Sequence, residues 1–452
     1  MSPCELSHLI SSPPSCYLVR MEMDTQRNVH GSVTRLLPIM GVVFMAFLII
    51  GLAMPVLPLH VHQGLGLSTF VVGLVAGSQF AASLVSRVWA GRHADIRGAK
   101  HAVVTGLLVA AAAGFLYLLS LRFVSEPEIS VTVLLLGRAL LGVGESFIIT
   151  GAQTWGLALA GPQNTGKVLA WMGTAMYAAF ALGAPAGTTL YAGHGFTAIA
   201  LATTLVPLAA LLLAAPVRRV APTARVRPAF SKVIAAVWVP GVGLALSSVG
   251  FGAITAFVSL LFAAHGWTVW PAFTSFAVAF ILARVFLGHL SDKVGGAKIA
   301  LVFVLIEAAG QGLIWLAPWS AMALIGAALT GFGYSLVYPG FGVEAVRGAP
   351  PQSRGLAMGA YTAFLDLTLG LAIPALGLLA SLAGLGMVFL ASMLLVLSAA
   401  FIAMRLLHAP QIKGDRNEGS RRDDRVALRN RSGIESGGAD KARYRSEANA
   451  AA

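Results

Sequence analysis

The sequence predicts an all-α membrane protein with twelve transmembrane helices in two pseudo-symmetric six-helix halves. Three observations support this fold class. Of 452 residues, 57% are hydrophobic and only 11% are charged. The apolar residues fall into twelve runs of membrane-spanning length. Finally, a short charged motif occurs once in each half of the chain, with the same spacing of glycine and aspartate.

The composition excludes an ordinary water-soluble domain, in which roughly 25% of residues are charged. The formal net charge of +13 would fit a nucleic-acid-binding protein. Such a protein, however, gathers its cations on one face of a polar domain. Here the Lys and Arg residues lie in short loops and in the C-terminal tail. The expected partner is therefore the lipid bilayer, and nucleic acid is not expected.

The twelve runs give the spans in order. A spanning helix needs about 20 mainly apolar residues to cross a hydrocarbon core of roughly 30 Å. Runs of this kind occupy residues 34–58, 68–90, 101–122, 131–156, 166–191, 195–216, 233–263, 270–290, 299–317, 320–346, 355–380 and 383–406. Only a few residues, at His194 and Gly384, separate the fifth run from the sixth and the eleventh from the twelfth. Counts of eleven and thirteen therefore stay open.

The distribution of cations predicts the orientation, because short cytoplasmic loops are enriched in Lys and Arg. With the N-terminus inside, the cytoplasmic loops hold nearly all of the loop cations, and the opposite loops hold only Arg122 as a clear exception. Both termini are expected in the cytoplasm. The predicted domains are a disordered segment 1–33, a six-helix half 34–216, a linker 217–232, a second half 233–406 and a disordered tail 407–452. Because both cysteines precede Met21 and Met23, translation starting at either methionine is a further hypothesis.

The repeated motif shows that the halves are related. "RVWAGRHADIRGAKH" begins at Arg87, and "RVFLGHLSDKVGGAK" begins 197 residues later at Arg284. This offset pairs Gly91 with Gly288, Asp95 with Asp292 and Gly98 with Gly295, while Lys100 and Lys298 lie at the ends of the two motifs. Further along, an offset of 189 pairs "GRALLGVGES" with "GAALTGFGYS", and Pro185 with Pro374. Two parallel six-helix repeats with a substrate site between them are typical of transporters.

The motif itself predicts a gating loop. Gly91 and Gly98 allow a tight turn. Asp95 and Asp292 lie at the membrane boundary, where each carboxylate suits the positive N-terminal end of a neighbouring helix. We expect these acids to hold the helix N-termini near Gly355 and Gly166 in the state closed to the cytoplasm. The alternative is a turn flanked by cations that only reach toward the membrane surface.

These residues carry a resemblance to a known family. "GRHADIRGAK" and "GHLSDKVGGAK" resemble the loop signature GxLaDrxGrk of the major facilitator superfamily, with departures at His93 and Ile96. "RALLGVGES" resembles its fourth-helix motif, and "GAPAG" is similar to a degraded form of its fifth-helix antiporter motif. The likeness covers residues 34–406, and in detail it is to the YhhS-type transporters of the bacterial inner membrane. It implies proton-coupled transport, and export, across that membrane. The bend positions that it implies are Gly183, Pro185, Gly187 and Pro374.

Four ionisable residues inside the predicted spans are candidates for proton coupling or substrate binding, because a charge in the bilayer is costly and is usually functional. They are Glu145, Asp366, Arg138 and Glu307, and their repeat partners are Tyr334, Tyr177, Ala327 and Ala110. None is duplicated. Arg138 and Glu145 are seven residues apart, so both lie on one face of a helix. Burial disfavours a charged carboxylate and a nearby Arg favours it, so Arg138 is expected to modulate Glu145. The alternative is a set of polar anchors that fix helix packing.

Other polar residues in the spans suit hydrogen bonds between helices better than a pathway: Gln79, Gln153, Gln311, Tyr177, Tyr334, Tyr338 and Tyr361. No cofactor, metal or ATP-binding motif is expected, and no nucleophile and base suggest an enzyme. The leading function is proton-coupled efflux of a small organic molecule, drug or sugar-like, by alternating access. An uncoupled facilitator or importer is the alternative, followed by a membrane sensor. Because one chain contains both halves, it is expected to function as a monomer.

Overall fold

The computed structural model describes residues 36–160, 165–220, 230–349 and 354–408, and within them it is almost entirely helical, without a strand. The predictions for segments 1–33 and 409–452, and for most of the linker, fall outside the described residues. The first helix covers residues 36–53. The later elements are α2 (Leu57–Leu59), the π-helical turn η1 (His60–Gly64), α3 (Thr69–Arg97), α4 (Ala99–Ser120), the 3₁₀ turn η2 (Leu121–Phe123), α5 (Pro127–Ala160), α6 (Thr165–Ala214), α7 (Phe230–Ala264), α8 (Trp270–Leu287), α9 (Leu290–Val294), α10 (Gly296–Trp315), α11 (Ser320–Arg347), α12 (Arg354–Ala383) and α13 (Leu385–His408).

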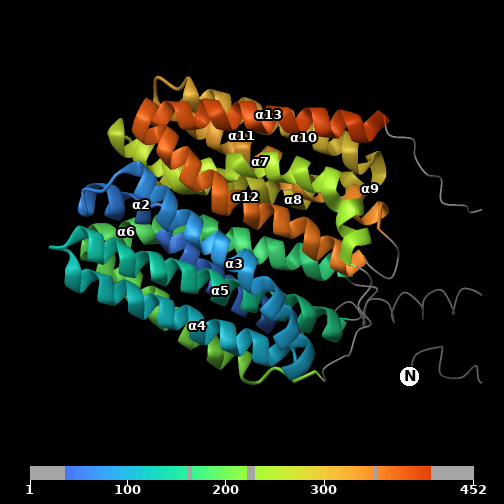
Figure 1. Ribbon diagram of the computed structural model, residues 1–452, viewed down its shortest axis with the longest axis horizontal. Helices are drawn as coiled ribbons and strands as arrows, with labels where there is room; N and C mark the ends of the chain where they lie inside the picture. The colour runs from blue at the N-terminus through green and yellow to red at the C-terminus, as the bar shows by residue number, and fades with distance from the viewer. Residues whose placement is uncertain (1–35, 161–164, 221–229, 350–353, 409–452) are drawn as a thin grey trace, which may run out of the picture. The chain divides into compact units, whose positions relative to one another are not determined.

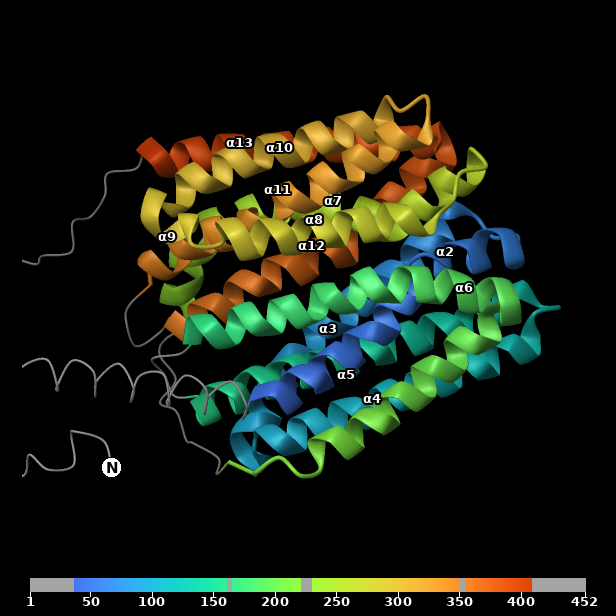
Figure 2. The ribbon, with the colours of Figure 1, turned by 180° about the vertical axis from the view of Figure 1, so that it is seen from behind.

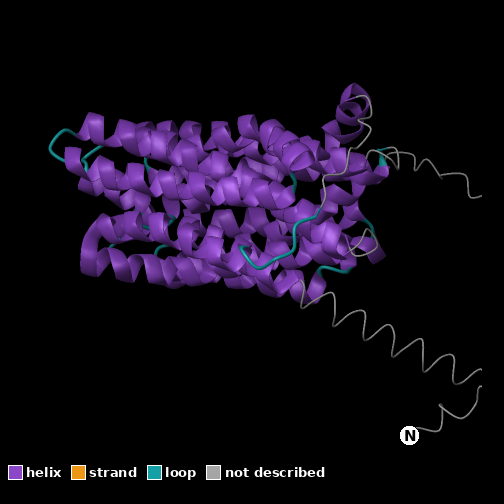
Figure 3. Ribbon diagram, turned by 90° about the horizontal axis from the view of Figure 1, so that it is seen from below, coloured by secondary structure: helices purple, strands orange, loops and turns teal. Residues whose placement is uncertain are grey.

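Eleven helices of the described chain are long and apolar enough to cross a membrane. One of them, Trp171–Ala214 within α6, has 44 residues, which is about twice the length that one crossing needs. It contains a break at Gly195, where φ is 63° and ψ is −165°. Figure 2 shows the chain reversing direction partway along α6, between its two arms. Two spans therefore lie within α6, and the structure is consistent with the twelve predicted spans. Figure 3 shows that nearly all of the described chain is helical and that the axes of the long helices are roughly aligned with one another.

The helices form two groups, as the repeat predicts. In Figure 1, elements α7 to α13 lie together on one side of α3 to α6. Within each group the third and fourth spans pack tightly, as α4 against α5 and as α10 against α11. The groups meet mainly where α3 packs on α12 and where α6 packs on α8. These two contacts are related by the repeat, because α8 is the counterpart of α3 and α12 is the counterpart of the first arm of α6.

Backbone contacts confirm that the repeat extends to atomic detail. A Cβ on Gly142 would lie 1.9 Å from the carbonyl oxygen of Gln79, and one on Gly331 would lie 2.1 Å from that of Phe276. Both residues of the second pair are the repeat partners of the first. The same holds for the turns, since Gly98 and Gly295 have φ values of 96° and 106°. Gly195 and Gly384 likewise share positive φ values, of 63° and 90°. Only glycine adopts such angles without strain, so the repeat preserves the positions of the turns.

Candidate functional site

An ion pair joins the two halves of the molecule. Arg87 Nε on α3 donates to Asp366 Oδ2 on α12 over 2.9 Å, and Arg87 Nη2 donates to the same oxygen. The side chain of Asp366 is 7% exposed and that of Arg87 is 22% exposed. A charge pair in this setting is held by Coulombic attraction that water screens only weakly. Sequence analysis assigned Arg87 to the gating loop and did not predict this partner.

A second carboxyl lies beside this pair. Glu145 Oε2 on α5 accepts a hydrogen bond of 2.6 Å from Gln79 Nε2 on α3. Asp366 and Arg87 are close enough to act on Glu145 electrostatically. The structure therefore brings together two of the predicted acids, Glu145 and Asp366, although they are 221 positions apart in the sequence. Gln79, which was expected to serve as interhelical glue, is the direct partner of Glu145.

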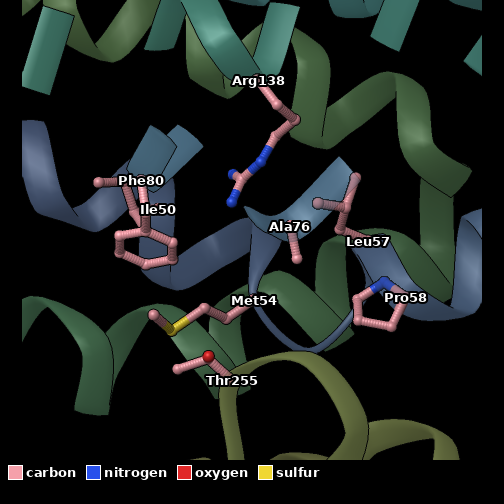
Figure 4. A pocket seen from close by; sticks show the side chains of 8 residues that line it. All are labelled: Ile50, Met54, Leu57, Pro58, Ala76, Phe80, Arg138 and Thr255. Carbon is pink, nitrogen blue, oxygen red and sulfur yellow. The ribbon is translucent and has the colours of Figure 1, made fainter. Parts of the chain in front are cut away.

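Arg138 lines a small pocket and acts on Glu145 through its charge rather than through a hydrogen bond. The described structure gives no hydrogen bond or ion pair between the two, and Arg138 Nη1 instead faces the hydroxyl of Tyr117 at 3.4 Å. Figure 4 shows the Arg138 guanidinium entering a space ringed by apolar side chains from the first helix, the turn after it, α2 and α3, with Thr255 of α7 on the far side. Its Nε is buried and finds no acceptor within the described residues. The pocket has about 20 Å³ of free volume, enough for a water molecule but not for an organic substrate.

Glu307 belongs to a separate buried network within the second half. Its Oε2 accepts from Ser247 Oγ over 2.5 Å, and its side chain has no exposure. One turn later on α10, Gln311 Nε2 donates to Gly250 O at 3.2 Å and contacts Thr330 Oγ1 at 3.3 Å. These groups tie α7, α10 and α11 together. The role of Glu307 in proton coupling stays a prediction.

The gating motifs have well-defined surroundings at several positions. Lys100 Nζ donates to the carbonyl oxygens of Ala215 and Val217 at 2.6 and 2.8 Å, just beyond the C-terminus of α6. Exposed carbonyls at a helix end attract a cation in this way. In the second half, Ala297 N at the start of α10 donates to Glu344 Oε1 over 3.1 Å.

The predicted latch by Asp95 and Asp292 stays a prediction. Gly91 and Asp95 lie in the last two turns of α3, Gly288 follows α8, and Lys298 is exposed on α10. The side chain of Asp292 lies outside the described residues.

The predicted bend positions are places of close packing. A Cβ on Gly183 or Gly187 would meet backbone atoms of residues 51 and 52 in the first helix, at 2.7 and 2.1 Å. Pro185 lies inside α6, and Pro374 lies inside α12. The ring of Pro374 packs where Gly77 of α3 leaves room, and nearby Thr69 Oγ1 donates to Gly377 O at 3.0 Å. This second seam between α3 and α12 closes the end of the interface away from the gating motifs.

Within the part of the chain that the structure describes, no group of three or more His, Cys, Asp or Glu residues could hold a metal ion. The polar groups that the site brings together are two carboxyls, a guanidinium and an amide. A carboxylate that is paired with a cation between two helices can bind a proton when the cation moves away.

Comparisons with known proteins agree with this architecture. The Major Facilitator Superfamily profile matches residues 39–271 and 266–443. An uncharacterized MFS-type transporter of Salmonella typhimurium is 42% identical over 379 residues, covering 84% of this chain and 98% of its own. The uncharacterized MFS-type transporter YhhS of Escherichia coli K12 is 40% identical, covering 81% of this chain and 91% of its own.

Solved structures share the fold at much lower identity. A bacterial homologue of the human lysosomal transporter Spinster, in an inward-facing and unoccupied conformation, has a TM-score of 0.66 at 14% identity and covers 83% of this chain and 96% of its own. The human organic anion transporter MFSD10 has a TM-score of 0.62 at 14% identity, covering 82% and 99%. The suspected resemblance is thus confirmed, and this chain belongs to the major facilitator superfamily of membrane transporters.

Proposed function

We propose that this protein is a secondary active transporter that exports a small organic molecule in exchange for protons, by alternating access. Membership of the superfamily supports transport of a small molecule. The antiporter-like motif at Gly183 to Gly187 favours export. In this proposal the protein acts as a monomer in a bacterial inner membrane, with both termini in the cytoplasm, and is not an enzyme.

The observation that carries the proton coupling is the ion pair between Arg87 and Asp366, because it bridges the two halves. Separating a charged pair in a low-dielectric interface is costly, since each partner would be left without its counter-charge. Protonation of Asp366 removes the Coulombic attraction and leaves Arg87 unpaired even in the closed interface, so separating the halves costs less than it does for the charged pair. The halves can then move apart at α3 and α12.

Glu145 is the second proton carrier in this scheme. Its hydrogen-bond partner Gln79 lies on α3, the helix that also carries Arg87 of the ion pair. Asp366 acts on Glu145 electrostatically, so protonation of Asp366 alters the charge that Glu145 faces. A proton on Glu145 and a proton on Asp366 are therefore coupled events. Arg138, on the same helix as Glu145, keeps positive charge at the pocket while the two acids change state.

The test is proton flux through the purified protein in liposomes, with an internal pH dye and an imposed gradient. Sugars, amphipathic cations and organic acids are screened for compounds that collapse the gradient. Asp366→Asn and Glu145→Gln are expected to abolish the coupled flux. Glu126→Gln, at an exposed acid between α4 and α5, is the matched control. Coupled flux at the parental rate in both variants would refute the proposed coupling.

The alternative functions give different results in the same experiments. An uncoupled facilitator or importer equilibrates compounds without proton movement, and Asp366 is then a packing or binding group. A membrane sensor depends on the tail, so deletion of residues 409–452 would abolish its activity. The proposed transporter is expected to keep its flux after this deletion.

A further inference from the structure

The repeat relates the carboxyl site to a second site of different chemistry. The four residues of the carboxyl site are Gln79, Arg87, Glu145 and Asp366, and their repeat partners are Phe276, Arg284, Tyr334 and Tyr177. Each site draws three residues from one half and one from the other. Both acids have become tyrosines and the amide has become a phenyl ring. The arginine alone is retained.

These partners are also equivalent in space. Gly142 contacts the backbone of Gln79 and Gly331 contacts that of Phe276, so α5 on α3 and α11 on α8 meet in the same register. Asp366 and Tyr177 each lie 12 residues after the first residue of their helices, α12 and α6. At 1.5 Å per residue this is about 18 Å, near the middle of a core of roughly 30 Å. Both sites therefore lie where a superfamily transporter holds its cargo.

Arg284 has no counter-charge among the described residues. Its Nη1 donates to the carbonyl oxygen of Ser335 at 3.1 Å, and its Nε is buried without an acceptor. The electrostatic neighbours around it are the hydroxyl groups of four tyrosines, at positions 177, 334, 338 and 361. By contrast, the repeat partner Arg87 is neutralised by Asp366.

Aromatic rings form the walls of this second site. Tyr177 of α6 stacks on Phe280 of α8 with ring centroids 3.4 Å apart, which joins the two halves. Phe251 stacks on Tyr334 at 5.4 Å, and the Arg284 guanidinium lies 5.7 Å from the centre of the Phe280 ring. Flat rings beside one cation without a counter-charge suit a planar organic anion. A cationic compound would be repelled by Arg284.

We propose that Arg284 and its surrounding tyrosines form the subsite that binds the anionic group of the transported molecule, and that this molecule is an aromatic or other planar organic anion. The inference rests on the proposed transport function, and it names the substrate class. The bound anion serves Arg284 as a counter-charge, as Asp366 serves Arg87 in the carboxyl site. Unused guanidinium donors supply the charge-assisted hydrogen bonds that recognise a carboxylate or sulfonate.

The test measures binding, so that it does not depend on proton coupling. The probe is naphthalene-2-sulfonate, and its uncharged match is naphthalene-2-sulfonamide, each titrated calorimetrically into the purified full-length protein. The anion is expected to bind the parent at least about tenfold more tightly than the sulfonamide, which is the scale of one charge-assisted contact. Arg284→Gln is expected to remove this preference, and Arg284→Lys to retain part of it.

A matched pair of variants separates charge from shape. Tyr177→Asp places a carboxylate where Asp366 stands in the other site, and it is expected to abolish anion binding by neutralising Arg284. Tyr177→Asn removes the same ring without adding charge, and it is expected to weaken both probes equally. Thermal unfolding of each variant without probe identifies any that fails to fold, in which case the Arg284→Gln and Arg284→Lys comparison decides.

Equal binding of the two probes to the parent, or equal loss in Tyr177→Asp and Tyr177→Asn, would overturn the proposal. Anion preference that depends on Arg284 together with unchanged flux in Asp366→Asn would refute the proton coupling and leave the anion site standing. Proton-coupled flux of a neutral or cationic compound, without Arg284-dependent binding, would refute the anion site and leave the proton coupling standing.

Discussion

Removing one partner of the ion pair between Arg87 and Asp366 is expected to cost almost as much free energy of unfolding as removing both. At 2.9 Å and an effective dielectric constant of about 20, two unit charges attract by about 6 kcal/mol. Desolvation offsets part of this attraction, and the 22% exposure of Arg87 screens more. We expect Asp366→Asn to cost about 3 kcal/mol of unfolding free energy, because it leaves the guanidinium unpaired, and Arg87→Met to cost a similar amount. The double variant is expected to cost little more than either single change.

The assay is unfolding by SDS titration, followed by tryptophan fluorescence, of the parent, both single variants and the double variant. The expected coupling energy of this cycle is about 2–4 kcal/mol. The control is the pair of Glu344 and Arg347, three residues apart on α11, where the Arg side chain is 54% exposed. A pair whose arginine is largely in solvent is expected to couple by less than about 1 kcal/mol, even though Glu344 is only 12% exposed. Additive costs for Arg87 and Asp366, within about 0.5 kcal/mol, would refute the view that this pair holds the halves together.

Three further predictions concern the scaffold around the site. Ser247→Ala leaves the buried carboxyl of Glu307 without its hydrogen bond, so SDS unfolding should show a loss of about 1–3 kcal/mol while proton flux stays at the parental rate. Changed flux would instead make Glu307 part of the coupling. Gly142→Ala would place a Cβ 1.9 Å from a carbonyl oxygen of α3, so we expect a loss of about 3 kcal/mol of unfolding free energy, or no folded protein. The control is Gly359→Ala, whose Cβ would have no neighbouring atom within 4 Å, and this variant should fold at least as well as the parent. Lys100→Met removes two hydrogen bonds at the end of α6, so limited proteolysis should cleave the following linker faster; an unchanged cleavage rate would contradict this anchoring role.

The spans and the repeat could be predicted from the sequence, because both depend on local patterns. Apolar length decides whether a helix can cross the bilayer. Positive-φ glycines decide where the chain turns, as at Gly195 and Gly384, and the narrowest gaps between the predicted runs lie there, at His194 and Gly384. The glycine spacing of the fourth span recurs in the tenth because the same helix contacts recur. Local sequence patterns were therefore sufficient to predict the helical scaffold.

The partners of the charged groups could not be predicted in the same way. Arg138 and Glu145 share a helix face, as their spacing of seven requires, and Arg138 acts on Glu145 through its charge, but the hydrogen-bond partner of Glu145 is Gln79 on another helix. Arg87 and Asp366 are 279 residues apart and meet only because α3 packs on α12. A single sequence fixes the face of a helix only roughly and says little about which distant helix meets it. The ion pair thus depended on tertiary packing.

The comparison of the halves separates residues that serve the scaffold from residues that serve chemistry. A position where both halves need the same backbone contact is held to the same residue in each, as with Gly142 and Gly331. A position where the halves differ is free of that requirement. Asp366 and its repeat partner Tyr177 differ, whereas both sites retain an arginine. The counter-charge of the arginine is therefore part of the protein in the carboxyl site only. One arginine is balanced within the protein, and the other is left for a charge that arrives with the cargo. Under the proposed function this division lets the proton and the cargo act on equivalent points of the same interface.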